Sequence, residues 1–534
     1  MASKYKVFVT DGVSPSGVDV LKACPQIEVI ESPTLKEKEL LEKLKGCDAL
    51  VVRSQTQVSK AVLQGCPTIR AVGRAGVGVD NVDVDAATEK GVVVMNTPAG
   101  NTVSTAEQAF TLLLGLARHL PQAHASMSAG QWDRKSFQGT ELNGKTLGIL
   151  GMGRIGGEVA RRAIAFGMRV MAYDPYLSAG KARSLQVELI DRVEDLLPQV
   201  DFITLHLPMT EETKGILSEE RLKLCRKGVK IVNCARGGLV SEAVLLKAIE
   251  AGQVGGAALD VFEEEPLVAE HPLRKSKRVI LTPHLGASTA EAQESVGIEI
   301  AEAIRDYLTE GAVRNAVNIP SVDARTMAKL RPQIEFGFRL GRLLSQIAPP
   351  RCDRLTISYA GKIGEEDTTP ITRSILKGFL FGAGGGEVNE VNAPKMAANL
   401  GLKLSETKQA EPGEYAELIS VRAGQDGKES EVSGTFFGTS PHIVRINEQW
   451  MEARPEGFLL LMENKDRPGI VGWIGTLLGK HKVNIASMTL SRSAPGSKAL
   501  SVLNLDSAPG VRDARLKGNT VADKDITSVK VVKI

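Results

Sequence analysis

The chain has 534 residues, of which 43% are hydrophobic and 24% charged, so it is long enough to form three or four domains. Its formal net charge of +3 is too close to neutral to indicate a nucleic-acid or membrane-surface partner, and no apolar run reaches the roughly 18 residues of a membrane span. The first residues show no cleavable targeting segment and the six cysteines are scattered without close pairs, which favours a cytoplasmic protein with free thiols and no metal site.

Strand and helix patterns alternate from the N-terminus, which predicts an α/β protein with parallel sheets. A long helix is expected at Thr102–Arg118, where Asn101 can cap the free N–H groups of the first turn. The strands and helices expected before it are Lys6–Val9, Gly17–Ala23, Ala49–Val52, Lys60–Gln64, Arg70–Val72 and Val92–Met95.

A second α/β unit begins at Gly144–Leu150. A helix over Ala290–Leu308 is expected to return to the first unit, so that two crossings join two lobes and a substrate lies between them. We therefore predict a first lobe of residues 1–98 and 290–319 and a second lobe of residues 99–289. The further strands expected in the second lobe are Arg169–Tyr173, Phe202–Leu205, Lys230–Asn233, Gly256–Val261 and Val279–Thr282.

The composition changes beyond Pro320, where residues 320–455 are more polar and indicate a separate α+β domain. Residues 456–534 carry most of a βαββαβ pattern, whose second helix, around Val511–Lys517, is short and poorly patterned. The other elements expected there are Phe458–Met462, Gly469–Gly479, Val483–Leu490, Ala499–Leu505 and Thr527–Ile534.

A dinucleotide-binding fingerprint, G-M-G-R-I-G, follows the first strand of the second lobe and opens a helix over Gly157–Ala165. The first glycine permits a tight turn, the second lets a pyrophosphate approach the backbone, and the third lets the helix pack against the strand. The phosphates would face the N–H groups at the start of the helix. The predicted cofactor-binding residues of this segment are Gly151, Gly153, Arg154, Ile155 and Gly156.

An acidic residue, Asp174, ends the next expected strand, 18 residues after Gly156. A carboxylate at this place can accept both ribose hydroxyls of NAD and repels a 2′-phosphate, so NAD is predicted rather than NADP. The alternative interpretation is a turn residue before Pro175.

Three separated segments each place one reactive side chain after an apolar run: Arg236, Glu265 and His284. Removal of hydride from a 2-hydroxy acid requires a base for the hydroxyl proton, and His284 suits this role because its usual pKa lies near neutrality. Glu265 can orient the imidazole and stabilise its charged form, and Arg236 can grip a carboxylate with two donors. Each residue alone is also compatible with a surface or core position, but the set behind a dinucleotide fold favours catalysis.

The sequence resembles the D-isomer-specific 2-hydroxyacid dehydrogenases from Arg53 to Ser288, through its segments Leu150–Gly156, Asn233–Gly238, Leu259–Pro266 and Pro283–Ser288. The resemblance implies two Rossmann-like doubly wound lobes, with NAD in the second lobe and substrate in the first. It also implies that Arg236, Glu265 and His284 are the catalytic residues. Further cofactor contacts implied by it are Val77, His206, Cys234, Asp260 and Gly286.

The segments Val52–Ser54, Val72–Asn81 and Gly130–Lys135 are similar to the substrate-binding segments of family members that act on a phosphorylated three-carbon acid. The implied reaction is oxidation of 3-phospho-D-glycerate to 3-phosphohydroxypyruvate, which opens L-serine biosynthesis. Such a substrate carries about three negative charges and needs several cations. Val77 departs from the threonine common in relatives, but a backbone amide can replace that contact. The implied substrate-binding residues are Arg53, Ser54, Arg74, Gly76, Asn101 and Arg134.

The Arg134 segment of similar enzymes can come from a neighbouring subunit, which implies a homodimer or homotetramer. Residues 320–455 resemble the intervening domain of the long family members. His442 stands where those relatives often carry an arginine, so an anion site there is doubtful. Residues 458–534 resemble an amino-acid-sensing ACT domain, which suggests L-serine as an effector. Its candidate ligands are Asn464, Asp466 and Asn484, although Asp466 alone can equally be a helix cap.

Two other functions are compatible with the same lobes: a glyoxylate or hydroxypyruvate reductase, and an NAD-sensing protein that resembles a corepressor. The two additional C-terminal domains argue against the first, because such reductases usually stop near residue 320. The intact arginine, glutamate and histidine argue against a protein that only binds NAD, and against a structural scaffold.

Overall fold

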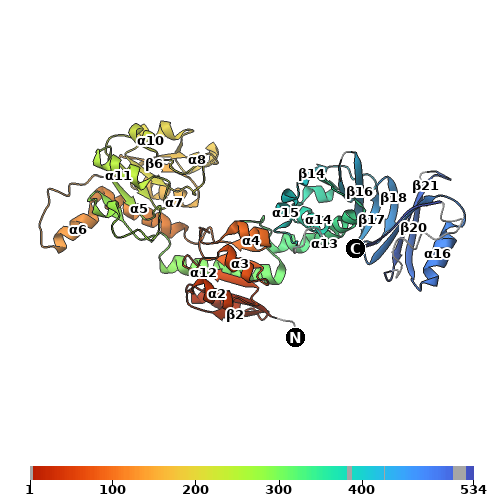
Figure 1. The fold of residues 1–534 in the computed structure, drawn as a ribbon. Helices are drawn as coiled ribbons and strands as arrows, with labels where there is room; N and C mark the ends of the chain where they lie inside the picture. Colours follow the sequence, from red (N-terminus) through yellow and green to blue (C-terminus); the bar gives the residue numbers. More distant parts are fainter. Residues whose placement is uncertain (1–3, 382–387, 426, 493, 509–524) are drawn as a thin grey trace.

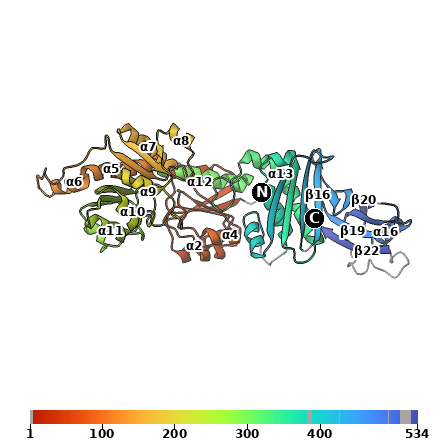
Figure 2. The same ribbon diagram turned by 90° about the horizontal axis from the view of Figure 1, so that it is seen from above.

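The computed structural model describes residues 4–381, 388–425, 427–492, 494–508 and 525–534. The molecule is elongated, with two α/β lobes at one end followed by two further units in a row (Figures 1 and 2). The described residues form sheets of five, seven, six and four strands. No helix in these ranges combines the length and the apolar character needed to cross a membrane.

The first lobe is a five-stranded parallel sheet of order β2-β1-β3-β4-β5. All four residues of β3 are buried, as expected for a parallel strand that is covered on both faces. Sequence reasoning missed β2, α2 and α4, which are short and bury few residues. The elements are β1 (Tyr5–Val9), α1 (Pro15–Lys22), β2 (Ile27–Glu31), α2 (Glu37–Lys43), β3 (Ala49–Val52), α3 (Lys60–Gly65), β4 (Ala71–Arg74), α4 (Val84–Lys90) and β5 (Val93–Met95).

Helix α12 (Ala290–Glu310) returns from the second lobe and packs on the first, as the sequence predicted. A Cβ at Gly73 of β4 would lie 2.7 Å from a carbon of Ile300 and 3.0 Å from one of Ile304, so α12 lies directly on the sheet. Figure 1 shows α12 running beside the first lobe.

The second lobe is a seven-stranded parallel sheet of order β12-β11-β10-β9-β6-β7-β8. The chain reverses its direction of growth between β6 and β9, which is the switch point at which dinucleotides bind in doubly wound folds. Two parallel, Rossmann-like lobes were predicted and are confirmed. The strands are β6 (Thr146–Leu150), β7 (Arg169–Tyr173), β8 (Glu188–Leu189), β9 (Phe202–Leu205), β10 (Val229–Asn233), β11 (Val254–Leu259) and β12 (Val279–Leu281).

The helices of the second lobe include α5 (Thr102–Arg118), which has the predicted bounds, and α6 (Leu120–Ser128), which buries none of its residues. Figure 1 places α6 at the outer end of the lobe. The predicted cap of α5 is wrong: the Asn101 side chain makes no capping hydrogen bond. Its φ of −113° and ψ of 13° differ from the extended backbone of a side-chain cap. The other helices are α7 (Arg154–Ala165), α8 (Ala179–Ser184), α9 (Val193–Leu196), α10 (Glu219–Leu224) and α11 (Glu242–Glu250).

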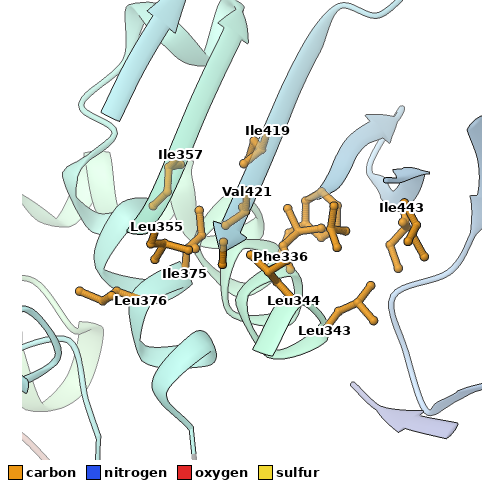
Figure 3. Packing of buried hydrophobic residues seen from close by; sticks show 14 of the residues in the cluster. Phe336, Leu343, Leu344, Leu355, Ile357, Ile375, Leu376, Ile419, Val421 and Ile443 are labelled. Carbon is orange, nitrogen blue, oxygen red and sulfur yellow. The ribbon is translucent and has the colours of Figure 1, made fainter. Parts of the chain in front are cut away.

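The third unit is a six-stranded mixed sheet of order β14-β13-β15-β16-β17-β18, packed against α13 and α14. Figure 3 shows side chains of both helices, such as Leu344 and Ile375, meeting Ile357 and Val421 of the strands. Its elements are α13 (Ala324–Ile347), β13 (Arg354–Gly361), α14 (Thr369–Leu380), α15 (Ala393–Asn399), β14 (Lys403–Gln409), β15 (Glu417–Gln425), β16 (Lys428–Phe437), β17 (Ser440–Ile446) and β18 (Gln449–Ala453).

The last unit is an antiparallel sheet of order β20-β21-β19-β22 with α16 on one face. The expected second helix around Val511–Lys517 lies outside the described residues. Leu459 and Val502 join the core of the third unit, so the two C-terminal units share one hydrophobic core. The elements are β19 (Phe458–Lys465), α16 (Ile470–Lys480), β20 (Ile485–Arg492), β21 (Lys498–Leu505) and β22 (Ile526–Lys533).

Candidate active site

The carboxyl ends of five parallel strands bring candidate residues to one edge of the seven-stranded sheet. Gly151 follows β6, Asp174 follows β7, His206 follows β9, Cys234 follows β10 and Asp260 follows β11. In open α/β sheets, ligands bind outside this edge. The alternation of apolar strands and polar turns was therefore enough to predict where these residues gather.

The glycine-rich turn has the geometry that a dinucleotide needs. Gly151 has a φ of 98°, and a Cβ there would lie 2.5 Å from the carbonyl oxygen of His206. A Cβ at Gly156 would lie 2.1 Å from the carbonyl oxygen of Gly151, whereas one at Gly153 would meet no atom within 4 Å. No side chain caps α7, so its first N–H groups are free to hold a phosphate. This part of the chain therefore fits NAD.

Asp174 accepts hydrogen bonds from the backbone N–H groups of Met152 and Tyr176, both at 2.8 Å. It thus forms the turn that was the alternative interpretation, and it also ties the glycine-rich loop to the end of β7. A carboxylate has about four acceptor positions, so two remain for ribose hydroxyls.

His206 and Cys234, which follow the neighbouring strands β9 and β10, are both uncharged. Burial lowers the pKa of His206 to about 4, so its imidazole is neutral at physiological pH. Its Nε2 lies 3.0 Å from Oγ1 of Thr204, and its buried Nδ1 has no hydrogen-bond partner in the described part of the chain. Burial, with the charge of Asp260, raises the pKa of the Cys234 thiol well above its usual value.

The carboxylate of Asp260 is fully buried and holds the loop that carries His284. It accepts hydrogen bonds from the N–H groups of Leu285 and Gly286, both at 2.8 Å, and from Oγ1 of Thr282 at 2.5 Å. Sequence reasoning expected a contact with the nicotinamide here. The hydrogen bonds show that Asp260 positions the loop, and the contact with the nicotinamide stays a prediction.

His284 and Glu265 form a hydrogen-bonded pair, with 2.7 Å between Nδ1 and Oε2. The other oxygen of Glu265 accepts the N–H of Phe262 at 3.0 Å, which fixes the carboxylate. The hydrogen bond that Nδ1 donates to Glu265 raises the pKa of His284, although burial opposes this. Burial works against the charge of Glu265, but these hydrogen bonds outweigh it and lower its pKa. The imidazole is thus oriented, with Nε2 left for a substrate.

Arg236 is held beside the cleft by its own turn and by a carboxylate that sequence reasoning missed. Its Nη1 donates to the carbonyl of Ala235 at 2.7 Å, and its Nε lies 3.3 Å from Oδ2 of Asp80. Buried Asn233 donates from Nδ2 to the carbonyl of Arg236 at 2.8 Å and supports the turn. Asp80 lies inside the Val72–Asn81 segment, but no local pattern indicated its partner.

A cleft of about 870 Å³ lies between the lobes and is lined by residues from both. Arg74 is the arginine of this cleft whose charge is most disfavoured. Burial, together with the charges of Arg236 and Arg53, lowers the pKa of Arg74 to about 10. Its buried Nε has no hydrogen-bond partner in the described chain. A cleft that Arg53 and Arg74 line, with the charge of Arg236 acting beside them, is suited to a multiply charged anion. The predicted residues that line it are Arg53, Ser54, Arg74, Gly76, Glu265 and His284.

The loop that carries Arg53 is held from two sides by residues that sequence reasoning missed. Oδ2 of buried Asp11 accepts the N–H groups of Arg53 at 2.9 Å and Thr56 at 3.0 Å. Asn81 donates from Nδ2 to the carbonyl of Arg53 at 2.8 Å. An acidic residue before a glycine, directly after a buried strand, is the local signal that could have indicated Asp11.

Two predicted substrate residues do not line the cleft of their own chain. Arg134 is exposed on the segment beyond α6, and Asn101 is partly buried at the start of α5, where its Oδ1 has no hydrogen-bond partner in the described chain. Val77 is partly buried, and its carbonyl accepts Nδ2 of Asn96 at 2.6 Å. Ile155 packs against a core of the second lobe, and Arg154 is exposed.

The three candidate effector ligands each have a different partner. Asn464 is buried and donates to the carbonyl of Lys465 at 2.9 Å. Asp466 pairs with Arg492 and accepts the N–H of Gly496 at 3.2 Å rather than capping α16. Asn484 donates to a carboxylate oxygen of Asp506 at 2.7 Å.

Comparison with known proteins identifies the family. Residues 110–286 match the NAD-binding domain of the D-isomer-specific 2-hydroxyacid dehydrogenases, and residues 329–447 match the D-3-phosphoglycerate dehydrogenase intervening domain. The D-3-phosphoglycerate dehydrogenase of Methanocaldococcus jannaschii is 42% identical over 94% of this chain and 95% of its own. The chain belongs to the D-3-phosphoglycerate dehydrogenase family. The D-3-phosphoglycerate dehydrogenase of Bacillus subtilis is 39% identical over 99% of this chain and all of its own.

Two solved structures each cover 59% of this chain. The glyoxylate reductase from Paecilomyes thermophila is 31% identical, with a TM-score of 0.55 over 59% of this chain and 99% of its own. The D-lactate dehydrogenase from Aquifex aeolicus, solved as a complex with NAD and lactic acid, is 28% identical, with a TM-score of 0.51 over 59% of this chain and 100% of its own.

Proposed function

We propose that this chain oxidises 3-phospho-D-glycerate to 3-phosphohydroxypyruvate with NAD, the reaction that opens L-serine biosynthesis. The observation that carries the proposal is one cleft that Arg53 and Arg74 line together with the His284–Glu265 pair. Arg236 lies near enough for its charge to act on both Arg74 and His284. The names of relatives aligned over nearly the whole chain support it.

The three guanidinium groups would bind different charged groups of the substrate. Arg236 lies beside the imidazole and would bind the carboxylate and polarise the developing carbonyl. Arg53 and Arg74 lie on the first lobe and would bind the phosphate. Arg74 gains most from an anion, because its charge is buried and its Nε lacks a partner in the described chain.

In the oxidation, neutral His284 accepts the hydroxyl proton of C2 at Nε2, since Nδ1 is held by Glu265. Glu265 then stabilises the imidazolium that forms. Bound NAD supplies the acceptor for the hydride that leaves C2. The N–H groups of α7 would hold its pyrophosphate and Asp174 its ribose, while neutral His206 and Cys234 keep charge away from the nicotinamide half.

Two features favour this reaction over reduction of glyoxylate or simple sensing of NAD. Glyoxylate has no phosphate, and a cleft with two additional arginines would leave buried positive charge unpaired. A sensor needs no oriented base, yet Glu265 and Asp260 both act to position His284 or its loop.

The experiment follows NADH fluorescence with 3-phospho-D-glycerate and with D-glycerate. Loss of the phosphate is expected to lower kcat/KM at least a hundredfold, since each charged hydrogen bond contributes about 1.5–3 kcal/mol. Arg74→Gln should remove most of this preference, whereas Arg325→Gln, an exposed change in the third unit, should not alter it. Equal turnover of both acids by the parent protein would contradict the proposal.

We also propose that the last unit is an ACT-like regulatory domain with L-serine as its effector. The order β20-β21-β19-β22, with α16 between β19 and β20, the first two strands of this unit, supports a βαββαβ unit. Asn464, Asp466 and Asn484 would have to exchange their present partners for the amino acid. Millimolar serine that changes neither the rate nor the thermal stability would contradict this.

We further propose a homo-oligomer in which Arg134 enters the cleft of a neighbouring subunit. Exposed Arg134 and the 79% exposed Trp132 support this, because they lie on a segment that lines no cleft of their own chain. The six cysteines, all within the described ranges, are free thiols, which supports a reducing compartment such as the cytoplasm.

A further inference from the structure

A second cavity, of about 330 Å³, lies where the first lobe meets the third unit, away from the catalytic cleft. Figure 1 shows α4 and α12 of the lobe beside α13 and α15 of the third unit. Direct contacts hold the two parts together next to the cavity. Asn389 donates from Nδ2 to the carbonyl of Gly91 at 2.7 Å, and Lys395 lies 3.2 Å from carboxylate oxygens of Asp85 and Glu89.

Three arginines line this cavity, one from the lobe and two from the third unit. Arg70, Arg331 and Arg373 form no ion pair with any carboxylate of the described residues. Arg373 is partly buried, its Nη1 donates only to the carbonyl of Glu390 at 2.7 Å, and burial lowers its pKa. A guanidinium that loses water without gaining an anion is costly, so an anion at this place would be stabilising.

The nearby carboxylates do not fulfil that role. Glu390 is paired with Lys377 at 2.9 Å, and Glu310 and Glu335 line the cavity without an ion pair to its arginines within the described residues. Arg70 and Arg331 are exposed, so Arg373 is the cation that burial leaves without a counter-ion. Arg70 is held in place by aromatic rings, its guanidinium carbon lying 5.6 Å from the ring centre of Tyr5 and 5.7 Å from that of Tyr307.

The remainder of the wall is largely apolar, which defines the rest of the ligand. Val93 and Val313 come from the lobe, and Ile334 and Val391 from the third unit. A volume of this size is at the lower end of small-molecule sites. An inorganic anion would leave the apolar wall unused, whereas an apolar molecule would leave the arginines unpaired.

We propose that this cavity binds a small organic anion, a carboxylate that carries a short apolar chain. The carboxylate lies against Arg373 with Arg70 or Arg331, and the chain lies against the valine and isoleucine wall. Because Arg70 belongs to the lobe and Arg373 to the third unit, the bound anion connects the part that contains the catalytic cleft with the C-terminal units. The proposal is independent of the reaction that the cleft catalyses.

Calorimetric titration of the full-length protein with hexanoate tests this site. One hexanoate per chain is expected to bind, and its neutral analogue hexanamide should bind at least tenfold more weakly, since a charged hydrogen bond is lost. Arg373→Gln should weaken hexanoate binding at least tenfold. Arg325→Gln, an exposed change on the helix that carries Arg331, and Arg236→Gln, in the catalytic cleft, should leave it unchanged.

Arg70→Gln provides a second test from the lobe side if Arg373→Gln fails to fold, as judged by near-ultraviolet circular dichroism. The absence of hexanoate binding to the parent protein would overturn the proposal. It would also be overturned if the Arg70 and Arg373 variants bound hexanoate as the parent does, or if Arg236→Gln abolished binding, because the ligand would then occupy the catalytic cleft.

Discussion

Replacement of Glu265 by glutamine should separate the orienting role of the carboxylate from the base itself. The change keeps the size of the side chain but removes the charge that faces Nδ1 of His284 at 2.7 Å. The N–H of Phe262 can still be accepted by the amide oxygen, so the local fold should persist. The variant therefore tests the interaction with His284 rather than the folding of the loop.

The expected loss follows from the hydrogen bond between an imidazolium and a carboxylate. Such a bond to a charged group contributes about 1.5–3 kcal/mol, and each 1.4 kcal/mol corresponds to a tenfold change in rate. The two side chains are 51% and 36% exposed, so the lower half of that range applies. Glu265→Gln is expected to lower kcat for oxidation about tenfold to fortyfold.

The pH dependence of the oxidation rate gives a second, independent prediction for this variant. Glu265 raises the pKa of His284, and oxidation needs the neutral imidazole, so the rate of the parent rises as the pH increases through this raised pKa. Without the carboxylate, His284 loses its proton at lower pH. The midpoint of the pH–rate profile should therefore move to lower pH in Glu265→Gln.

The profile is obtained from initial rates of NADH formation between pH 5.5 and 9.5. A slower rate with substrate deuterated at C2 would show that hydride transfer limits the measured rate. Glu264→Gln is the matched control, because Glu264 is an exposed neighbour in the same segment. A Glu265→Gln protein with the parental kcat and an unshifted midpoint would refute the reasoning.

Two further changes test the cofactor site and the assembly. Asp174→Asn keeps an oxygen for the N–H of Met152 but removes the charge that repels a 2′-phosphate. The preference for NAD over NADP, measured as the ratio of the two kcat/KM values, should therefore fall about tenfold or more. An unchanged ratio would count against the ribose role. Coexpressed Arg134→Gln and His284→Ala chains should recover about a quarter of the parental activity if a dimer shares its sites, because half of the dimers are mixed and each contains one intact site. Activity no higher than that of the single variants would place Arg134 in its own chain.

Much of the fold could be predicted from local patterns. The helix Thr102–Arg118 and the strands Ala49–Val52 and Phe202–Leu205 were predicted with the observed bounds, because long apolar periods and flanking glycine, proline or asparagine residues are local signals. Short exposed elements such as α2 carry little of that signal and were missed. The cap at Asn101 was wrong because the backbone there is not extended, which the residue type alone does not reveal.

The candidate site divides in the same way. Arg236, Glu265 and His284 could be predicted because each follows an apolar strand, and parallel strands end at one edge of the sheet. The residues that hold these three in place could not be predicted from the sequence. Asp11 reaches a loop more than 40 positions away, and Asp80 reaches Arg236 across the interlobe cleft. Such carboxylates look like ordinary turn or surface residues until the chain is folded.

The sequence alone thus determined the order of the elements, the dinucleotide turn and the chemical types of the reacting groups, because these depend on neighbours within a few residues. The tertiary structure decided which charges meet. It buried Asp260 beneath the His284 loop, gathered Arg53, Arg74 and Arg236, and placed Arg134 outside its own cleft. The physical reason is that burial and pairing of a charge depend on distances between lobes, and a local periodicity carries no information about such distances.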